Sequence, residues 1–207
     1  MVDAVSNAAG QFETILTLNK TMEELHMKHG RTLRRLAEGG LIAAMYTALT
    51  LLLAPLSFGM GQFRVAEMLT ILPVFTPAAI PGLTVGCLLS NLLGLATGAN
   101  VIGAWDLLLG PTATLLAAIA SYGVRRFRVK GLPLLSTLPP VIFNAVAVGW
   151  ELTFALFGFS WGIYGLIALQ VAAGQLAACT VCGLLLYAAL TRSGAAKAIF
   201  HQNGAAV

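Results

Sequence analysis

Long stretches without any charged residue dominate the chain. No Asp, Glu, Lys or Arg occurs within residues 39–63, 68–105, 107–124 or 152–191. A transmembrane helix needs roughly 20 mainly apolar residues, and its backbone polar groups must be satisfied within the segment because lipid offers no partners. The uncharged runs therefore predict membrane-spanning helices.

Glycine and proline divide these runs. Gly59 and Gly61 end the first helix, Pro73 shortens the second, and residues 76–82 turn the chain before the third. A glycine-rich loop at residues 96–103 follows the third helix. We therefore expect an all-α integral membrane protein with a six-transmembrane-helix bundle in residues 36–192. The predicted helices are residues 36–56, 63–75, 80–95, 105–124, 132–155 and 161–190.

The basic residues predict the orientation of the bundle. An even number of spans places both termini on one side, and that side collects eleven of the twelve Lys and Arg residues. Cytoplasmic loops carry such an excess, so we expect an N-in, C-in topology in a bacterial-type cell membrane. Residues 1–35 and 193–207 then form cytoplasmic tails, and Arg64 is the exception on the outer side.

Composition narrows the class further. The 207 residues are 58% hydrophobic and only 10% charged, whereas soluble domains carry about 25% charge. The net charge of +4 is explained mostly by the basic residues on the cytoplasmic side of the membrane. A nucleic-acid partner is therefore not needed to explain it. The chain has no phosphate-binding loop, no H-E-x-x-H zinc pair and no G-x-S-x-G elbow, so we expect no enzyme, no cofactor and no metal.

The N-terminal tail leaves two interpretations open. Phe12, Ile15, Leu18, Met22 and Leu25 recur at roughly helical spacing with charged residues between them. Such a pattern suits an amphipathic helix on the inner membrane surface. A solvated, partly ordered tail explains so short a pattern equally well.

Polar residues converge at the predicted outer ends of the helices. Carboxylates inside a membrane segment cost about 2.5–3.5 kcal/mol on insertion scales, so they usually face a wet cavity or a partner. An outward-opening pocket of carboxylates and amides suits a compact solute that is cationic or rich in hydrogen-bond donors, such as an amino-purine-like ring. The candidate substrate-binding residues are Arg64, Glu67, Asn91, Asp106, Asn144, Trp150, Glu151 and Gln175.

Every candidate except Glu151 also has a purely structural interpretation. Arg64 and Glu67, three residues apart, would neutralise each other on one helix. Asp106 would be a solvated residue at a helix start, and Trp150 an anchor in the aromatic belt. The amides of Asn91, Asn144 and Gln175 would join helices by hydrogen bonds.

A stripe of small residues marks the first predicted span. Gly40, Ala44 and Ala48 recur every four residues, which allows another helix to approach closely. The spacing leaves open whether that helix belongs to this chain or to a partner.

Several sequence segments resemble a known family. The chain is similar to the QueT family, the queuosine-precursor S components of energy-coupling factor (ECF) transporters, across nearly all of the predicted helices. The segments that carry the resemblance are residues 48–59 (ALTLLLAPLSFG), 62–67 (QFRVAE), 72–75 (LPVF), 79–87 (AIPGLTVGC), 91–94 (NLLG), 106–110 (DLLLG) and 139–145 (PPVIFNA).

The resemblance implies an S-component type of fold and a binding role. Such a subunit captures a 7-deazaguanine from outside and docks on a transmembrane coupling protein driven by two ATPase subunits. The first helix of that family group carries an A-x-x-x-A coupling motif, which Ala44 and Ala48 match. The sixth helix of the family has Gly-Glu where this chain has Gly174 and Gln175, a difference that bears on ligand choice.

Two other functions remain compatible with the sequence. The same fold could bind another vitamin-like heterocycle. The chain could also be a structural or assembly subunit of the membrane, in which the polar cluster only packs helices.

Overall fold

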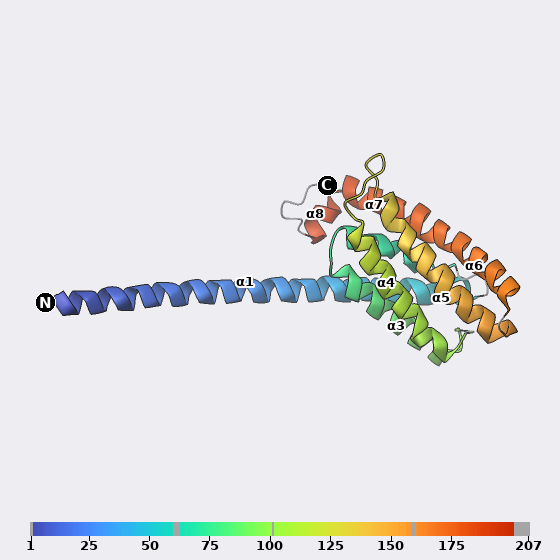
Figure 1. Ribbon diagram of the computed structural model, residues 1–207, viewed down its shortest axis with the longest axis horizontal. Coiled ribbons are helices and arrows are strands. Elements are labelled where there is room, and N and C mark those ends of the chain that lie inside the picture. The colour runs from blue at the N-terminus through green and yellow to red at the C-terminus, as the bar shows by residue number, and fades with distance from the viewer. Residues whose placement is uncertain (1, 60–62, 101, 159, 201–207) are drawn as a thin grey trace. The chain divides into compact units, whose positions relative to one another are not determined.

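The computed structural model describes residues 2–59, 63–100, 102–158 and 160–200, with only the backbone described for residues 2–19. The regular elements among these residues are helices, and an isolated bridge joins Val129 to Leu132 (Figure 1). The chain divides into two units, Met1–Ala37 and Glu38–Val207.

The first unit is helical. Helix α1 (Val2–Leu52) begins here, and most of its side chains from Lys20 to Ala37 are exposed, including Met22 and Leu25. The structure therefore contains a helix where the sequence also allowed a partly ordered tail. The location of this helix on the inner membrane surface stays a prediction.

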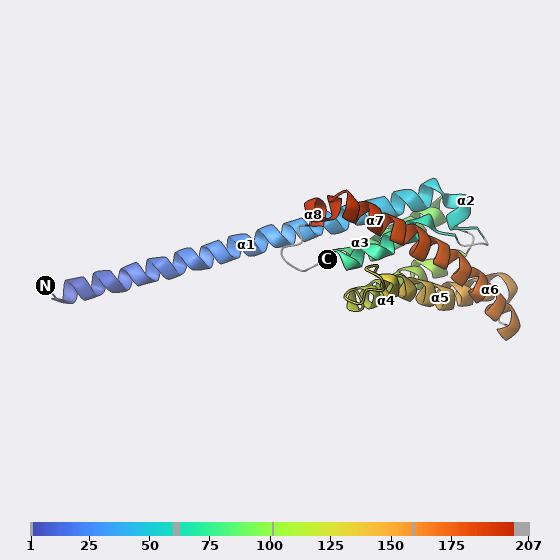
Figure 2. The ribbon, with the colours of Figure 1, turned by 90° about the horizontal axis from the view of Figure 1, so that it is seen from above.

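The second unit is a bundle of helices in which α5 packs against both α4 and α6, as the views along different axes show (Figures 1 and 2). After residues 38–52 of α1, its elements are α2 (Ala54–Ser57), the 3₁₀ helix η1 (Val65–Val74), α3 (Ala79–Ala96), the 3₁₀ turn η2 (Ala104–Leu107), α4 (Leu109–Gly123), the 3₁₀ turn η3 (Leu134–Thr137), α5 (Leu138–Phe157), α6 (Trp161–Gln175), the π-helical segment η4 (Leu176–Cys182), α7 (Gly183–Arg192) and α8 (Ala195–Phe200).

Four helical segments of the described chain are long and apolar enough to cross a membrane. They are Ala79–Ala96, Ala104–Gly123, Leu134–Phe157 and Trp161–Arg192, and Val65–Val74 is a shorter apolar helix. These segments begin and end within a few residues of the predicted helices. The prediction of an all-helical fold with several helices able to span a membrane is thus confirmed, whereas the count of six spans and their direction stay predictions.

The second predicted helix is a 3₁₀ helix, η1. At roughly 2.0 Å rise per residue, its ten residues extend about 20 Å, compared with about 15 Å for an α-helix of the same length. It contacts α3, α4, α7 and η4, and all its residues except Val65 and Met68 are buried. Leu69, Ile71 and Leu72 of η1 contribute to the main hydrophobic core of the unit. A short segment therefore occupies the middle of the bundle.

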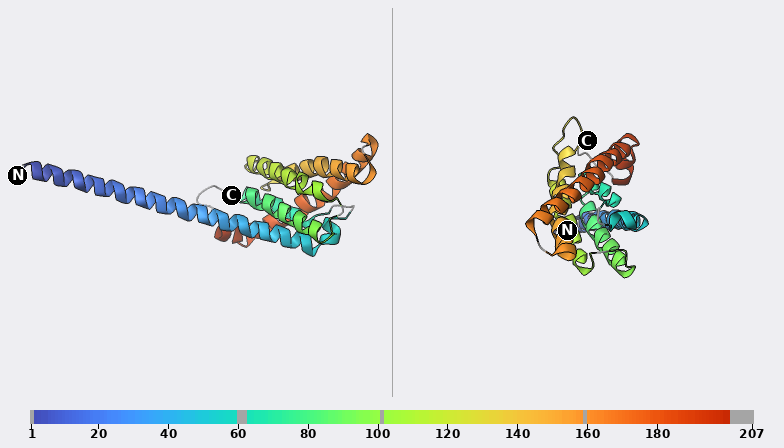
Figure 3. Two further views of the ribbon diagram at one scale, coloured as in Figure 1. Left: turned by 90° about the horizontal axis from the view of Figure 1, so that it is seen from below. Right: turned by 90° about the vertical axis from the view of Figure 1, so that its right-hand side faces the viewer.

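The segment predicted as the sixth helix changes its winding midway. The α-helical part ends at Gln175, a π-helical stretch follows over Leu176–Cys182, and α7 resumes the α-helix. Such π segments are rare and frequently lie at functional sites. Beyond α7, the ring of Phe200 on α8 stacks at 5.8 Å on Phe75, so the start of the predicted C-terminal tail packs on the core. The end-on view in Figure 3 shows α6 and α7 crossing the bundle.

Close packing of α1 against α3 depends on glycines. A Cβ atom on Gly82 would lie 2.7 Å from the carbonyl oxygen of Gly39, and one on Gly86 would lie 2.8 Å from Cβ of Tyr46. The Thr47 hydroxyl also donates a hydrogen bond to the Gly86 carbonyl at 3.1 Å. Small residues let membrane helices approach in this way.

The predicted small-residue stripe lies beside this contact. Gly40, Ala44 and Ala48 are exposed, and a Cβ atom on Gly40 would meet no described atom within 4 Å. Internal packing uses the neighbouring residues Gly39 and Ala43 instead. Within the described part of the chain, the stripe is therefore free to receive another helix.

We predict that Gly86→Ala weakens the fold. The added methyl group would lie 2.8 Å from Cβ of Tyr46 and 3.0 Å from the Ala43 carbonyl, so α1 and α3 must separate. Overpacking of this kind costs about 1–3 kcal/mol. Thermal unfolding of the protein in detergent should show a lower midpoint.

Gly165→Ala is the matched control for that experiment. Gly165 lies within α6, and a Cβ atom there would have open space around it. Its midpoint should stay equal or rise slightly, since alanine favours a helix over glycine. Equal midpoints for the two variants would show that the α1–α3 contact does not require Gly86.

Candidate functional site

A buried ion pair organises the polar residues of the bundle. Nη2 of Arg64, just before η1, lies 2.7 Å from Oδ2 of Asp106 in η2, and both side chains are buried. Arg64 is thus neutralised by Asp106, and the interpretation that pairs it with Glu67 is wrong. Asp106 is fully buried, so its interpretation as a solvated helix-start residue is wrong too.

Further hydrogen bonds surround the pair. Asn100 donates from Nδ2 to Oδ2 of Asp106 at 2.9 Å, and Asn91 donates from Nδ2 to the Asp106 carbonyl at 2.7 Å. The Arg64 Nε atom donates to the Ser57 carbonyl at 3.3 Å. Such bonds help a buried ion pair to be tolerated, although Oδ1 of Asp106 and Oδ1 of Asn91 have no hydrogen-bond partner among the described residues. Asn91 is therefore a buried support for Asp106.

Gly110 makes room for this network. A Cβ atom at that position would lie 2.6 Å from Nδ2 of Asn91 and 2.6 Å from Oδ1 of Asp106. Any side chain there would push the two groups apart. The first turn of α4 can therefore pack directly on the ion pair only because residue 110 is glycine.

Glu67 presents one free carboxylate oxygen. Its Oε1 atom accepts a hydrogen bond of 2.6 Å from the hydroxyl of Tyr46 on α1. Its Oε2 atom is buried and makes no hydrogen bond of good geometry among the described residues, although the Asn144 side chain interacts with the same carboxylate. An unsatisfied buried acceptor is costly, so this oxygen is a strong candidate for contact with a ligand.

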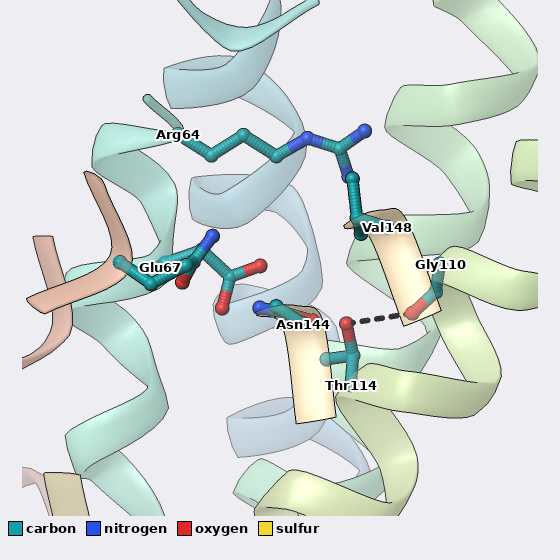
Figure 4. A pocket seen from close by; sticks show the side chains of 7 residues that line it. Arg64, Glu67, Gly110, Thr114, Asn144 and Val148 are labelled. Atoms are coloured by element: carbon teal, nitrogen blue, oxygen red, sulfur yellow. Dashed lines mark hydrogen bonds between the residues drawn. The ribbon is translucent and has the colours of Figure 1, made fainter. Parts of the chain in front are cut away.

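A small pocket opens beside Glu67. Figure 4 shows its lining, with the amide of Asn144 turned toward the Glu67 carboxylate. The enclosed space has almost no room for even a water molecule, far below the roughly 300–1,000 Å³ typical of small-molecule sites, so a ligand would require the surrounding side chains to move. The lining residues are Arg64, Glu67, Gly110, Thr114, Asn144, Val148 and Gln175.

Four of the eight predicted site residues line this pocket: Arg64, Glu67, Asn144 and Gln175. They come from the start of η1, from α5 and from the end of α6. The Oε1 atom of Gln175 accepts a hydrogen bond from the Cys179 thiol at 3.1 Å, at the point where the π-helical segment begins.

Glu151 lies one turn beyond the pocket on α5. Asn144, Val148 and Glu151 follow each other at four and three residues, which places them on one face of this helix. The side chain of Glu151 is 1% exposed, and neither of its oxygens has a hydrogen-bond partner among the described residues. It therefore continues the polar face of α5 without lining the pocket itself.

Trp150 lies outside the pocket. Its ring stacks on Phe154 at 5.5 Å, and Trp105 meets Phe154 edge-on at 6.5 Å. All three rings are exposed by more than a third of their surface. The structure thus places Trp150 in an aromatic cluster on the surface, where the belt interpretation also applies.

Sequence reasoning did not find Tyr46, Thr114 or Val148. Tyr46 carries a polar group on the buried face of a membrane helix, and this is a signal that could have identified it. The Thr114 hydroxyl donates to the Gly110 carbonyl at 3.0 Å, a hydrogen bond within α4 that Figure 4 shows. Because a hydroxyl in a helix commonly makes such a bond, the residue type alone does not indicate a binding site. No group of three His, Cys, Asp or Glu residues in the described chain is placed to hold a metal ion.

Comparisons with known proteins agree on one family. The sequence model of the QueT transporter family matches residues 36–192. A curated relative, the queuosine precursor transporter QueT of Lactococcus lactis subsp. cremoris (strain MG1363), is 37% identical over 65 residues, which cover 30% of this chain and 38% of that protein. No solved structure matches the chain. Because the family match runs from the apolar part of α1 to the end of α7, this chain belongs to the QueT transporter family.

Proposed function

We propose that the chain is the substrate-binding S component of an ECF-type importer. It captures a queuosine precursor of the 7-deazaguanine class outside the cell and passes it to a membrane coupling protein driven by two ATPase subunits. Membership of a transporter family makes it a transport protein and not an enzyme. The observation that carries the substrate class is that buried carboxylate oxygens of Glu67 and Glu151, like Oδ1 of the paired Asp106, have no hydrogen-bond partner among the described residues.

The free oxygens suit the guanine-like edge of a deazaguanine. That edge offers paired N–H donors, and a carboxylate accepts such donors in short, charge-assisted hydrogen bonds. Glu67 suits this contact, because it lines the pocket and its Oε2 atom makes no hydrogen bond of good geometry among the described residues. The amides of Asn144 and Gln175 can donate and accept at the other edges of the ring.

The charge balance favours a cationic ligand. Arg64 cancels Asp106, so Glu67 and Glu151 have no cation bound to them among the described residues. Buried charges are stable when they are paired. An aminomethyl substituent on the deazaguanine would bring a positive charge to Glu151 while the ring binds at Glu67.

The proposed orientation has six spans with both termini inside the cell. Arg64 was the exception to the distribution of basic residues. Its burial against Asp106 explains the exception, because a neutralised arginine inside the bundle does not report on the charge of a loop. The site then opens toward the outside of a multi-pass protein in the cell membrane.

The coupling protein is proposed to dock on α1. Gly40, Ala44 and Ala48 form an exposed small-residue stripe there, next to the face that packs on α3. A helix of the coupling protein could approach this stripe as closely as α3 approaches Gly39 and Ala43.

Glu67→Gln and Glu151→Gln should each weaken ligand binding. A hydrogen bond to a charged group contributes about 1.5–3 kcal/mol, which is roughly a tenfold change in Kd or more. Isothermal titration of the purified variants with 7-aminomethyl-7-deazaguanine measures this change.

Glu24→Gln is the matched control, because it makes the same chemical change at a residue that is exposed in the first unit. Native affinity in both site variants would reject the proposed site. An absence of any deazaguanine binding by the native protein would favour another heterocycle or a structural role.

The 7-substituent should be recognised by its charge. We expect 7-aminomethyl-7-deazaguanine to bind more tightly than 7-cyano-7-deazaguanine, because only the first offers a cation to Glu151. Competition binding gives the ratio of the two affinities, and Glu151→Gln should reduce it about tenfold. A ratio that Glu151→Gln leaves unchanged would remove Glu151 from this role.

Ala48→Trp should abolish uptake and spare ligand binding. The indole would fill the exposed stripe on α1 and keep a partner helix away. Uptake of labelled ligand by cells, together with co-purification of the ATPase subunits, tests the docking face. Ala173→Trp, an equal change at an exposed alanine of α6, serves as control. Normal uptake by Ala48→Trp would place the docking face elsewhere.

A further inference from the structure

Tyr46 has no role in the function proposed so far. It lies on α1, its side chain is completely buried, and it is not among the residues that line the pocket. Its hydroxyl nevertheless donates a hydrogen bond of 2.6 Å to Oε1 of Glu67, which does line the pocket. Tyr46 thus contacts the carboxylate from α1, a helix that contributes no residue to the lining of the pocket.

The backbone of Glu67 is held by its own helix. The Glu67 N–H donates to the Arg64 carbonyl at 3.0 Å, and the Thr70 hydroxyl donates to the Glu67 carbonyl at 2.6 Å. These local bonds fix the start of the side chain but leave the carboxylate free to rotate. The bond from Tyr46 comes from a different helix, 21 residues earlier, and acts on the carboxylate itself.

We propose that Tyr46 is a positioning residue of the binding site, whose hydroxyl holds Oε1 of Glu67 so that Oε2 stays directed to the ligand. This inference rests on the proposed function, because it gives a purpose to the free oxygen at the pocket. A carboxylate that is already oriented loses less freedom when the ligand binds, and such preorganisation raises affinity.

The packing of α1 supports a fixed position for Tyr46. Gly86 of α3 lies so close that a Cβ atom on it would be 2.8 Å from Cβ of Tyr46. The hydroxyl of Thr50 donates to the Tyr46 carbonyl at 2.9 Å. The backbone and Cβ atom of Tyr46 are therefore closely packed, and the complete burial of its side chain favours a fixed hydroxyl beside Glu67.

Glu151 shows the contrasting case. It is equally buried, but neither of its oxygens has a hydrogen-bond partner among the described residues. Glu67 is oriented before the ligand arrives, whereas Glu151 has no such support.

If Tyr46 served only to pack α1, the protein would need its ring and not its hydroxyl.

Tyr46→Phe separates the two roles because it keeps the ring and removes the hydroxyl. We expect Kd for 7-aminomethyl-7-deazaguanine to rise about tenfold by isothermal titration, the change that corresponds to about 1.4 kcal/mol. The infrared band of the Glu67 carboxylate, assigned by its loss in Glu67→Gln, should shift because the short hydrogen bond has gone. Tyr187→Phe is the matched control, since the buried Tyr187 hydroxyl accepts from Arg128 at 2.7 Å and does not line the pocket.

The outcomes distinguish this inference from the proposed function. Weaker binding together with a shifted carboxylate band, in Tyr46→Phe but not in Tyr187→Phe, supports the positioning role. Native affinity in Tyr46→Phe overturns it, and so does weaker binding with an unmoved band. If the native protein binds the ligand and Glu67→Gln weakens binding while Tyr46→Phe does not, only the role of Tyr46 is lost. Failure of the native protein to bind would instead overturn the proposed function.

Discussion

The ion pair between Arg64 and Asp106 constrains the rest of the site. Two charges buried in an apolar bundle are tolerated when they pair with each other and further hydrogen bonds satisfy other polar atoms of the pair. This requirement draws Asn91 and Asn100 to Asp106 and leaves space only for glycine at position 110. Because Arg64 immediately precedes η1, the pair also fixes the start of the short central helix that carries Glu67.

Helix α1 has two faces with different partners. Gly39, Ala43 and Tyr46 face the bundle, where α3 packs on them and the Tyr46 hydroxyl reaches Glu67. Ala44 and Ala48 lie about 200° around the helix from Tyr46, because each residue turns the helix by about 100°. One helix thus contacts a residue of the pocket on one side and presents the proposed docking stripe on the other.

Some parts of the site followed from residue type and position. Charged groups in a membrane segment indicate a cavity or a partner, and this rule found Arg64, Glu67, Asp106 and Glu151. It did not show how they pair, since Arg64 and Asp106 are 42 residues apart and the nearer Glu67 looked like the partner. Asn144 and Gln175, two of the candidate binding residues, line the pocket. Trp150 did not, because it points to the surface and stacks on Phe154.

The sequence by itself determined that the protein is helical and belongs in a membrane, because backbone groups in lipid need partners within their own segment and long uncharged runs have no other stable environment. It also located most helix ends, since glycine and proline act locally. Only the tertiary structure decided which polar groups meet: the 3₁₀ form of η1, the partner of Arg64 and the support of Glu67 by Tyr46 all depend on contacts between distant segments. Spacing along one helix carries no information about the helix that packs against it.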